Sequence, residues 1–373
     1  MGIAPTKQKK TQDRKTMKRF SKGFFYLLIL PIIWGFFGWQ GWAWWSWASA
    51  APQSQEQVNS ANGSGNSVKI LIPPGTSSQQ IGEDLKAAGL IRSDLAWRLW
   101  ARWLVFQNPQ GDFKAGSYAL APTQSLSQVA STIWNGEVMT LSFTVPEGWS
   151  IQQMAEYFEG QGFFSAAEFL AASRQIPYQD YPWLPPNLPL LEGFLFPDTY
   201  QVEAAEVTPQ GVIRQMLDRF QDQALPVYQQ AASKHNLSLN EWVALASIVE
   251  KEAVIPSERN RISGVFHNRL QQGIQLGADP TVEYALGIRQ TVDQPLTFKQ
   301  VETPSPYNTY INVGLPPTAI ASPGLASLKA TLTPEKTDYL YFMARYDGTH
   351  IFSRTEAEHQ AAIAEVERNL SAQ

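Results

Sequence analysis

The sequence predicts an α+β protein with an N-terminal transmembrane helix, a small α+β module and a larger α+β domain. Three observations predict this arrangement. A long uncharged hydrophobic stretch occurs near the N-terminus, one strand–turn–helix pattern occurs twice, and the C-terminal half alternates helical periodicity with loops rich in Pro and Gly. A chain of 373 residues has the length of two or three folded units.

The composition excludes several classes of protein. The chain has no Cys, so it has no disulfides, cysteine nucleophiles, iron–sulfur clusters or thiolate zinc sites. Hydrophobic residues make up 44% of the sequence, which is enough to form buried cores. Residues 1–22 carry eight Lys or Arg and one Asp, and the remainder carries 21 basic and 32 acidic residues, a net charge of −11. A body this acidic is a poor binder of nucleic acid, which is therefore not an expected partner.

Residues 24–47 are predicted to form the transmembrane helix. No charged side chain occurs between Lys22 and Glu56, and a helix over this range spans about 36 Å, more than the roughly 30 Å of a hydrocarbon core. The basic residues 1–23 predict a cytoplasmic tail, which places the body on the outer, periplasmic side of the inner membrane. A cleaved signal peptide is the alternative, because residues 48–50 resemble a cleavage site, although signal peptides have a shorter apolar segment of about 7–15 residues.

A linker and then a repeat follow this helix. Residues 48–67 have almost nothing to bury and predict a flexible linker. Residues 72–91 and 145–164 align at an offset of 73 residues with seven of twenty positions identical, so the two copies are expected to share a structure. Each copy predicts a strand, a Pro-x-Gly turn, a helix opened by a Ser–Gln capping box, and a Gly in the left-handed conformation after the helix. These residues are Ser77, Gln80 and Gly89 in the first copy and Ser150, Gln153 and Gly162 in the second.

The first copy begins a small α+β module over residues 68–140, and the second begins the larger domain, residues 141–373. Sequence pattern alone leaves two interpretations of the small module open, a structural spacer and a glycan-binding module. The further elements expected in the module are a helix over 93–106, a strand over 116–120 and a helix over 126–133. The larger domain is expected to end in a β-hairpin turning at Asp347-Gly348 and a helix capped by Thr355.

Glu252 is the first candidate for chemistry. The capping box Ser238–Glu241 opens a helix, and at about 100° per residue Glu252 falls on the same side as its apolar residues, whereas Glu250 falls on the opposite side. A carboxylate on an apolar face is paired, protonated or functional, and desolvation raises its pKa toward the range that a general acid needs. The alternative is a structural salt bridge, for instance with Arg259 or Arg269.

Other polar groups occur beside aromatic rings, a combination that suits a sugar-binding groove, in which rings stack on sugar faces and amides and carboxylates bind hydroxyls. For each of them alone, ordinary loop and turn chemistry is the alternative interpretation. The candidates for substrate binding are Glu192, Asp198, Asp279, Tyr307, Asn308 and Tyr310.

Several chemistries lack their motifs. The chain has no GxSxG elbow, no Walker loop and no dinucleotide-binding glycine spacing. Its four His residues have no HExxH-like spacing. We therefore expect neither a metal nor a cofactor.

At this point a resemblance emerges. The chain resembles the YceG-like family of endolytic murein transglycosylases, membrane-anchored enzymes that cut peptidoglycan glycan strands. The similarity runs from about residue 68 to about residue 363. The segments that carry it are LEGFLFPDTY, ASIVEKEA, VFHNRL, LGADPTVEYALG, SPYNTYINVGLPPTAIASPG and SLKATLTP with YLYF after it. The Trp-rich anchor is the clearest departure from the family.

The resemblance implies a LysM-like glycan-binding module over residues 68–140 and a catalytic transglycosylase domain over 141–373. The family's catalytic Glu corresponds to the second Glu of EKE, which is Glu252. The implied activity is lytic cleavage of the bond between N-acetylmuramic acid (MurNAc) and N-acetylglucosamine (GlcNAc), leaving 1,6-anhydro-MurNAc ends and ending nascent strands, with peptidoglycan synthases as possible partners.

Two other functions stay open. A hydrolytic muramidase would use Asp198 or Asp279 to activate water and would leave ends heavier by one water. A non-catalytic wall-binding scaffold would bind glycan equally well without Glu252 and would release no fragments.

Overall fold

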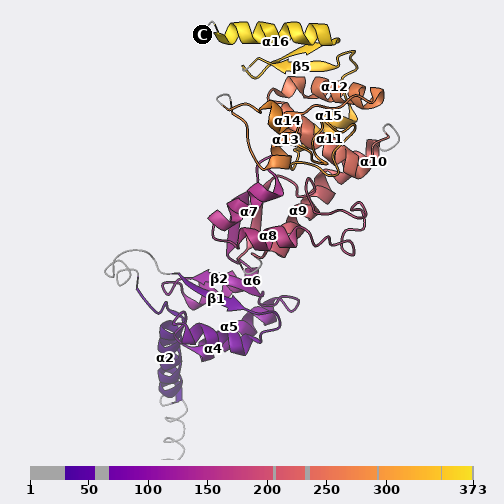
Figure 1. Ribbon diagram of the computed structural model, residues 1–373. Helices are drawn as coiled ribbons and strands as arrows, with labels where there is room; N and C mark the ends of the chain where they lie inside the picture. Colours follow the sequence, from indigo (N-terminus) through magenta and orange to yellow (C-terminus); the bar gives the residue numbers. More distant parts are fainter. Residues whose placement is uncertain are drawn as a thin grey trace, which may run out of the picture. The chain divides into compact units, whose positions relative to one another are not determined.

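The computed structural model describes residues 30–54, 67–204, 207–231, 236–291, 294–345 and 347–371. The chain divides into two compact units (Figure 1). Unit 1 comprises Met1–Thr140 and Glu203–Ala205, and unit 2 comprises Leu141–Val202 and Glu206–Gln373. Both units mix helices with small two-stranded sheets, which confirms the α+β class.

Unit 1 packs helices against a two-stranded antiparallel sheet, in which Ile70 lies opposite Tyr118. The strand expected over 116–120 is confirmed, and the helix expected over 93–106 occurs one residue later. The core includes Leu85, Trp97 and Val129, none of which is exposed. The elements are α2 (Leu30–Ser49), β1 (Val68–Ile72), α4 (Ser78–Ala87), α5 (Asp94–Gln107), β2 (Gly116–Leu120) and α6 (Leu126–Asn135).

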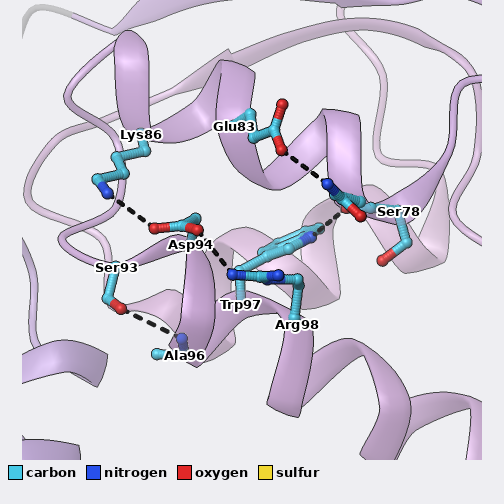
Figure 2. Close-up of polar contacts among 9 residues, drawn as sticks. Ser78, Glu83, Lys86, Ser93, Asp94, Ala96, Trp97 and Arg98 are labelled. Carbon is cyan, nitrogen blue, oxygen red and sulfur yellow. Dashed lines mark hydrogen bonds and ion pairs between the residues drawn. The ribbon is translucent and has the colours of Figure 1, made fainter.

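Polar contacts fix α4 and α5 to one another. Figure 2 shows Trp97 donating from Nε1 to the Ser78 carbonyl at 2.7 Å. Asp94 accepts from Lys86 at 2.7 Å and from Arg98 at 3.0 Å (Figure 2). A Cβ at Gly82 would lie 2.4 Å from the Trp97 ring, so this close helix packing requires glycine.

The two copies of the repeat share their local structure, as expected. Ser77 accepts the backbone N–H of Gln80, and Ser150 accepts that of Gln153, with the reciprocal side-chain bond present only in the second copy. The turn and post-helix glycines all have positive φ: 79° and 70° in the first copy, 76° and 73° in the second. They are Gly75, Gly89, Gly148 and Gly162.

The N-terminal helix differs from the expectation. Over the described ranges, no helix has the length and apolar character needed to cross a bilayer. Residues 24–29 of the predicted transmembrane helix, and the basic tail before them, lie outside the described residues. The transmembrane helix is therefore not confirmed.

The predicted linker starts later than residue 48. Ala48 is fully buried in the core of unit 1, and Ser49 ends α2. The backbone N–H of Gln53 donates to the Pro122 carbonyl at 3.0 Å. The first residues of the range 48–67 therefore pack on the module, and residues 55–66 lie outside the described residues.

Unit 2 contains two neighbouring cores. One is formed around α7, α8, α9 and the start of α11, and the other surrounds the end of α11 with α12 and α13. β3 pairs with β4, and β5 pairs with β6. The elements are β3 (Thr140–Thr144), α7 (Ile151–Gly160), α8 (Ala166–Ala172), β4 (Thr199–Glu203), α9 (Pro209–Gln223), α10 (Leu225–Ala231), α11 (Leu239–Glu252), η2 (Pro256–Glu258), α12 (Arg259–Gln272), α13 (Asp279–Leu286), α14 (Phe298–Val301), α15 (Leu325–Leu332), β5 (Tyr341–Ala344), β6 (His350–Ser353) and α16 (Glu356–Ser371).

The C-terminal hairpin and helix are confirmed. β5 and β6 are antiparallel, with Phe342 opposite Phe352. α16 lies along this hairpin (Figure 1). Thr355 caps α16 by accepting the backbone N–H of Glu358 at 3.2 Å.

Candidate active site

Helix α11 carries Glu252 to the edge of the core. Ser238 and Glu241 form the expected capping box at its start. Every residue from 242 to 249 is buried, and Trp242 donates from Nε1 to the Leu328 carbonyl at 2.9 Å. The helix ends at Glu252, so a rigid, fully packed element positions this carboxyl group.

Glu252 lines a cavity of about 860 Å³ in unit 2. Four segments that are separate in sequence form its wall: the end of α11, the stretch from α12 through α13 to residue 295, Tyr310, and the C-terminal hairpin with α16. The lining side chains that bear on chemistry are Lys251, Glu252, Arg269, Asp279, Glu283, Arg289, Gln290, Tyr310, Glu356 and His359.

The surroundings of Glu252 favour its protonated form. Its side chain is partly exposed to the cavity, yet burial of the carboxyl group raises its pKa from 4.5 to about 8, and the negative charges of Asp279 and Glu283 add to the rise. Lys251 acts in the opposite direction but less strongly. In the part of the chain that the structure describes, no hydrogen bond or ion pair holds this carboxyl group. Near neutral pH, Glu252 therefore has a proton to give.

The salt-bridge alternative is not found in the described residues. Arg269 donates to the carbonyls of Leu340, Gln275 and Leu276 instead, at 2.5, 3.0 and 3.0 Å. Its guanidinium group lies over the Tyr341 ring at 4.8 Å. Arg269 thus closes one side of the cavity without neutralising Glu252.

Asp279 is held as an acceptor beside Glu252. It is the first residue of α13, where the helix N-terminus favours negative charge. The Tyr310 hydroxyl donates to its Oδ1 at 2.5 Å, and Gln290 donates to its Oδ2 at 2.9 Å. Burial, followed by the charge of Asp279, raises the pKa of Tyr310, so the phenol remains a donor.

The loop before Tyr310 is fastened to α13 by buried threonines. Thr309 accepts the backbone N–H of Ala278 at 3.0 Å, and its hydroxyl lies 2.9 Å from that of Thr281. Gly277 donates to the Thr309 carbonyl at 3.0 Å. These contacts fix Asp279 and Tyr310 relative to one another.

Glu192 is a second buried acid, but it does not line the cavity. It accepts the backbone N–H of Ile151 at 3.0 Å and the hydroxyl of Tyr284 at 3.0 Å. Burial raises its pKa from 4.5 to about 8, against the lowering effect of these two donors. Glu192 thus joins the start of α7 to α13 as a neutral acid.

Three other candidates have protein partners and also do not line the cavity. Asp198 pairs with Arg219 at 2.6 Å. The Tyr307 hydroxyl lies 3.0 Å from that of Thr318, and Asn308 is fully buried, donating to the carbonyls of Val301 and Thr303. The structure therefore brings Asp279 and Tyr310 to Glu252 and places Glu192, Asp198, Tyr307 and Asn308 elsewhere in unit 2.

Sequence reasoning missed several lining residues. Glu283 and Gln290 follow Asp279 in sequence, but no known motif has this spacing. The backbone N–H of Gln290 donates to the Glu283 side chain at 2.9 Å. His359 comes from α16, where its ring stacks on Tyr341 at 5.1 Å, and burial lowers its pKa. No local signal could have linked α16 to the cavity, because only the tertiary fold brings the two together.

Comparison with known proteins agrees with this picture. The model of the YceG-like family matches residues 70–365. An endolytic murein transglycosylase of Bacillus subtilis (strain 168) is 32% identical over 308 residues, covering 79% of this chain and 83% of that protein. One from Streptococcus pneumoniae serotype 2 (strain D39) is 31% identical over 328 residues, covering 80% of this chain and 58% of that protein.

A solved structure is also similar. The crystal structure of a YceG-like protein from Listeria monocytogenes aligns with a TM-score of 0.54 at 32% identity, covering 80% of this chain and 99% of that one. The matched region includes unit 2 up to α16 and most of unit 1. On these grounds the chain belongs to the YceG-like family.

Proposed function

We propose that this chain is a lytic transglycosylase that cuts peptidoglycan strands internally between MurNAc and GlcNAc, with Glu252 as the catalytic acid and base. One observation carries the proposal. Glu252 lines a large cavity with a pKa of about 8, and in the described residues no cation or donor holds it. A carboxyl group in that state suits proton donation near neutral pH.

Two proton transfers by the same group complete the reaction. Protonated Glu252 donates to the glycosidic oxygen as the bond from muramic C1 breaks, and the GlcNAc hydroxyl leaves. The carboxylate then takes the proton of the muramic C6 hydroxyl, whose oxygen bonds to C1. The products are a 1,6-anhydro end and a free hydroxyl, and no water is consumed. The intramolecular hydroxyl replaces water because its effective concentration is high, so a second catalytic carboxylate of the kind used by ordinary glycosidases is unnecessary.

Asp279 and Tyr310 are proposed to act at the same site. Two donors, the Tyr310 hydroxyl and the Gln290 amide, hold the Asp279 side chain in place. Its negative charge beside Glu252 keeps the pKa of Glu252 high and stabilises the positive charge that develops at the sugar C1. Tyr310 orients Asp279 through the hydrogen bond that its hydroxyl donates.

The proposal extends to the cell. Residues 24–47 would tether the chain to the cell membrane, on the strength of their uncharged sequence. Residues 68–140 would bind glycan as a LysM-like module, and the enzyme would end nascent strands beside peptidoglycan synthases.

Product analysis tests the activity. Wild type, Glu252→Gln and Glu250→Gln are incubated with purified glycan strands, and fragment ends are identified by mass spectrometry. Wild type should leave anhydro ends, and Glu252→Gln should lower the rate by about 10²–10⁴-fold, the usual worth of a general acid–base. Glu250→Gln is the matched control, since Gln retains an oxygen to accept the Gly324 N–H.

The other two functions give different results. Ends heavier by one water would identify a hydrolase. Glycan binding without fragments from wild type would identify a scaffold, and a Glu252→Gln variant that cuts at the wild-type rate would remove Glu252 from the mechanism.

A further inference from the structure

Helix α5 is apolar on both of its faces. Ala96, Trp97 and Ala101 are buried on the inner face. The side chains on the other side are exposed: Leu95, Leu99, Trp103 and Val105 are between 44% and 48% exposed, and Phe106 is 83% exposed. These five residues define the α5 outer face, and a group of large exposed apolar side chains of this kind marks a surface that binds a protein or a membrane.

The orientation of this face is fixed. Trp97 is buried and its Nε1 donates to the Ser78 carbonyl, while Asp94 holds both Lys86 and Arg98 (Figure 2). The contact between Gly82 and the Trp97 ring leaves no room for a turn of α5 about its axis. These contacts hold α5 in one orientation against α4, with the outer face turned away from the core of unit 1.

The α5 outer face is continuous with the surface of α2. The rings of Trp45 and Trp100 stack with centroids 6.2 Å apart, and Trp100 contacts Trp103 at 4.7 Å. At the end of α2, Arg92 lies over the Trp47 ring at 5.9 Å and donates to the Trp47 carbonyl. α2 itself has no charged residue and exposes large apolar side chains along its length, including Trp34, Phe37 and Trp42.

The charges beside this face are basic. Arg98, which pairs with Asp94, and Arg102 are exposed on the same side of α5 as these apolar residues, whereas residues 23–373 as a whole carry a net charge of −11. Leu, Trp and Phe side chains flanked by Arg are typical of helices at the boundary between headgroups and acyl chains, where Arg reaches the phosphates. In a two-fold contact with a second copy, the same face would meet itself and bring arginines together, which favours lipid over a second copy.

We propose that unit 1 lies on the surface of an anionic bilayer, with the α5 outer face inserted at the headgroup boundary. The inference rests on the membrane attachment proposed above and goes beyond it. The module is docked on the lipid rather than held away from it by a linker.

The absence of Cys makes a direct test simple, because a single introduced Cys is unique. The full chain is reconstituted in vesicles of phosphatidylethanolamine and phosphatidylglycerol with a nitroxide at Phe106→Cys, Lys69→Cys or Trp34→Cys. Lys69 is the matched control, because it is exposed on β1 while its neighbours Val68 and Ile70 face the core. The accessibility of each label to oxygen and to a water-soluble nickel chelate is then measured.

The label at 106 should be several-fold more accessible to oxygen than to the chelate, and the label at 69 should be more accessible to the chelate than to oxygen. A label at 106 as accessible to the chelate as the one at 69 would overturn the proposal. So would a label excluded from both reagents, which would mean that protein covers the face. If the label at 34 is accessible mainly to oxygen and the label at 106 mainly to the chelate, the chain is attached to the membrane but the α5 outer face is not inserted. If both report water, the membrane attachment fails with it.

Discussion

The carboxyl groups of unit 2 differ in the partners that surround them. Asp198 pairs with Arg219, and Glu250 accepts the Gly324 N–H at 3.1 Å. Glu252 has neither kind of partner in the described residues and lies near two other acids, which raises its pKa. The surroundings of Glu252, and not its residue type, therefore favour its protonated form.

The pH dependence of cleavage follows from this environment. In the proposed mechanism the first step requires protonated Glu252, so kcat should fall as pH rises through about 8. In Asp279→Asn the fall should occur at lower pH, because removing a negative neighbour lowers the pKa of Glu252. The measurement is kcat against pH on glycan strands.

A matched variant separates this effect from a general loss of charge. Asp198→Asn removes a carboxylate that does not line the cavity and should leave the midpoint unchanged. Equal midpoints in wild type and Asp279→Asn would contradict the electrostatic role of Asp279.

At the scale of elements, buried polar contacts join helices that are distant in sequence. Glu192 connects the start of α7 to Tyr284 of α13. Its pKa is raised from 4.5 to about 8, so its contribution to stability is fully present below pH 4.5 and is lost as pH rises toward 8. Glu192→Gln, which does not titrate, should reduce the fall in unfolding temperature over this range.

Thermal unfolding between pH 5 and pH 8 measures this change. Glu252 has a similar shift, so Glu192→Gln should flatten the profile in part and the double variant with Glu252→Gln should flatten it further. A single variant with the wild-type slope would show that Glu192 titrates normally.

Gly193 marks a close approach between segments of unit 2. Its φ is +86°, and a Cβ there would lie 2.4 Å from the Ala319 side chain and 2.6 Å from that of Val243 on α11. Gly193→Ala should lower the free energy of unfolding by about 1–3 kcal/mol for overpacking, plus roughly 1–2 kcal/mol for the backbone. Denaturant-induced unfolding measures the loss.

Gly162→Ala is the matched control for that substitution. Gly162 also has a positive φ, +73°, but no atom lies within 4 Å of its Cβ position. It should lose only the backbone contribution. Equal losses in the two variants would contradict the packing argument.

Local sequence patterns predicted many elements because their causes are local. A capping serine, a glycine with positive φ or an Asp-Gly turn acts within a few residues, which is why α7, α11 and the β5–β6 hairpin occur where expected. The candidate site was harder to predict. Whether Asn308 binds its own loop or a ligand depends on which way the loop folds, and the short-range pattern is the same in both cases.

The helical periodicity of α11 also gave incomplete information. The helix is buried on every side from residue 242 to 249, so the apolar stripe is not its only buried face. What distinguishes Glu252 from Glu250 is its place at the end of the helix beside the cavity. That distinction depends on where α13 and α16 lie. The spacing of residues within α11 contains no information about their positions.

At the scale of the whole molecule, the proposed tether and the catalytic unit have separable effects. A chain of residues 67–373 should cleave isolated strands at the wild-type rate, because unit 2 contains the entire cavity. It should lose preference for nascent strands still attached to lipid. Cleavage of membrane-bound and free strands in one assay measures the ratio, and an unchanged ratio would count against the tether.

The cavity wall formed by β5, β6 and α16 has a consequence for how activity begins. Residues 341–360 supply this wall and are synthesised long after the α11 carboxylate. A chain that ended before these residues would have Glu252 in a cavity that lacks one wall and would not enclose a glycan strand. The proposed catalytic acid therefore has a complete cavity around it only once the chain has been made as far as α16.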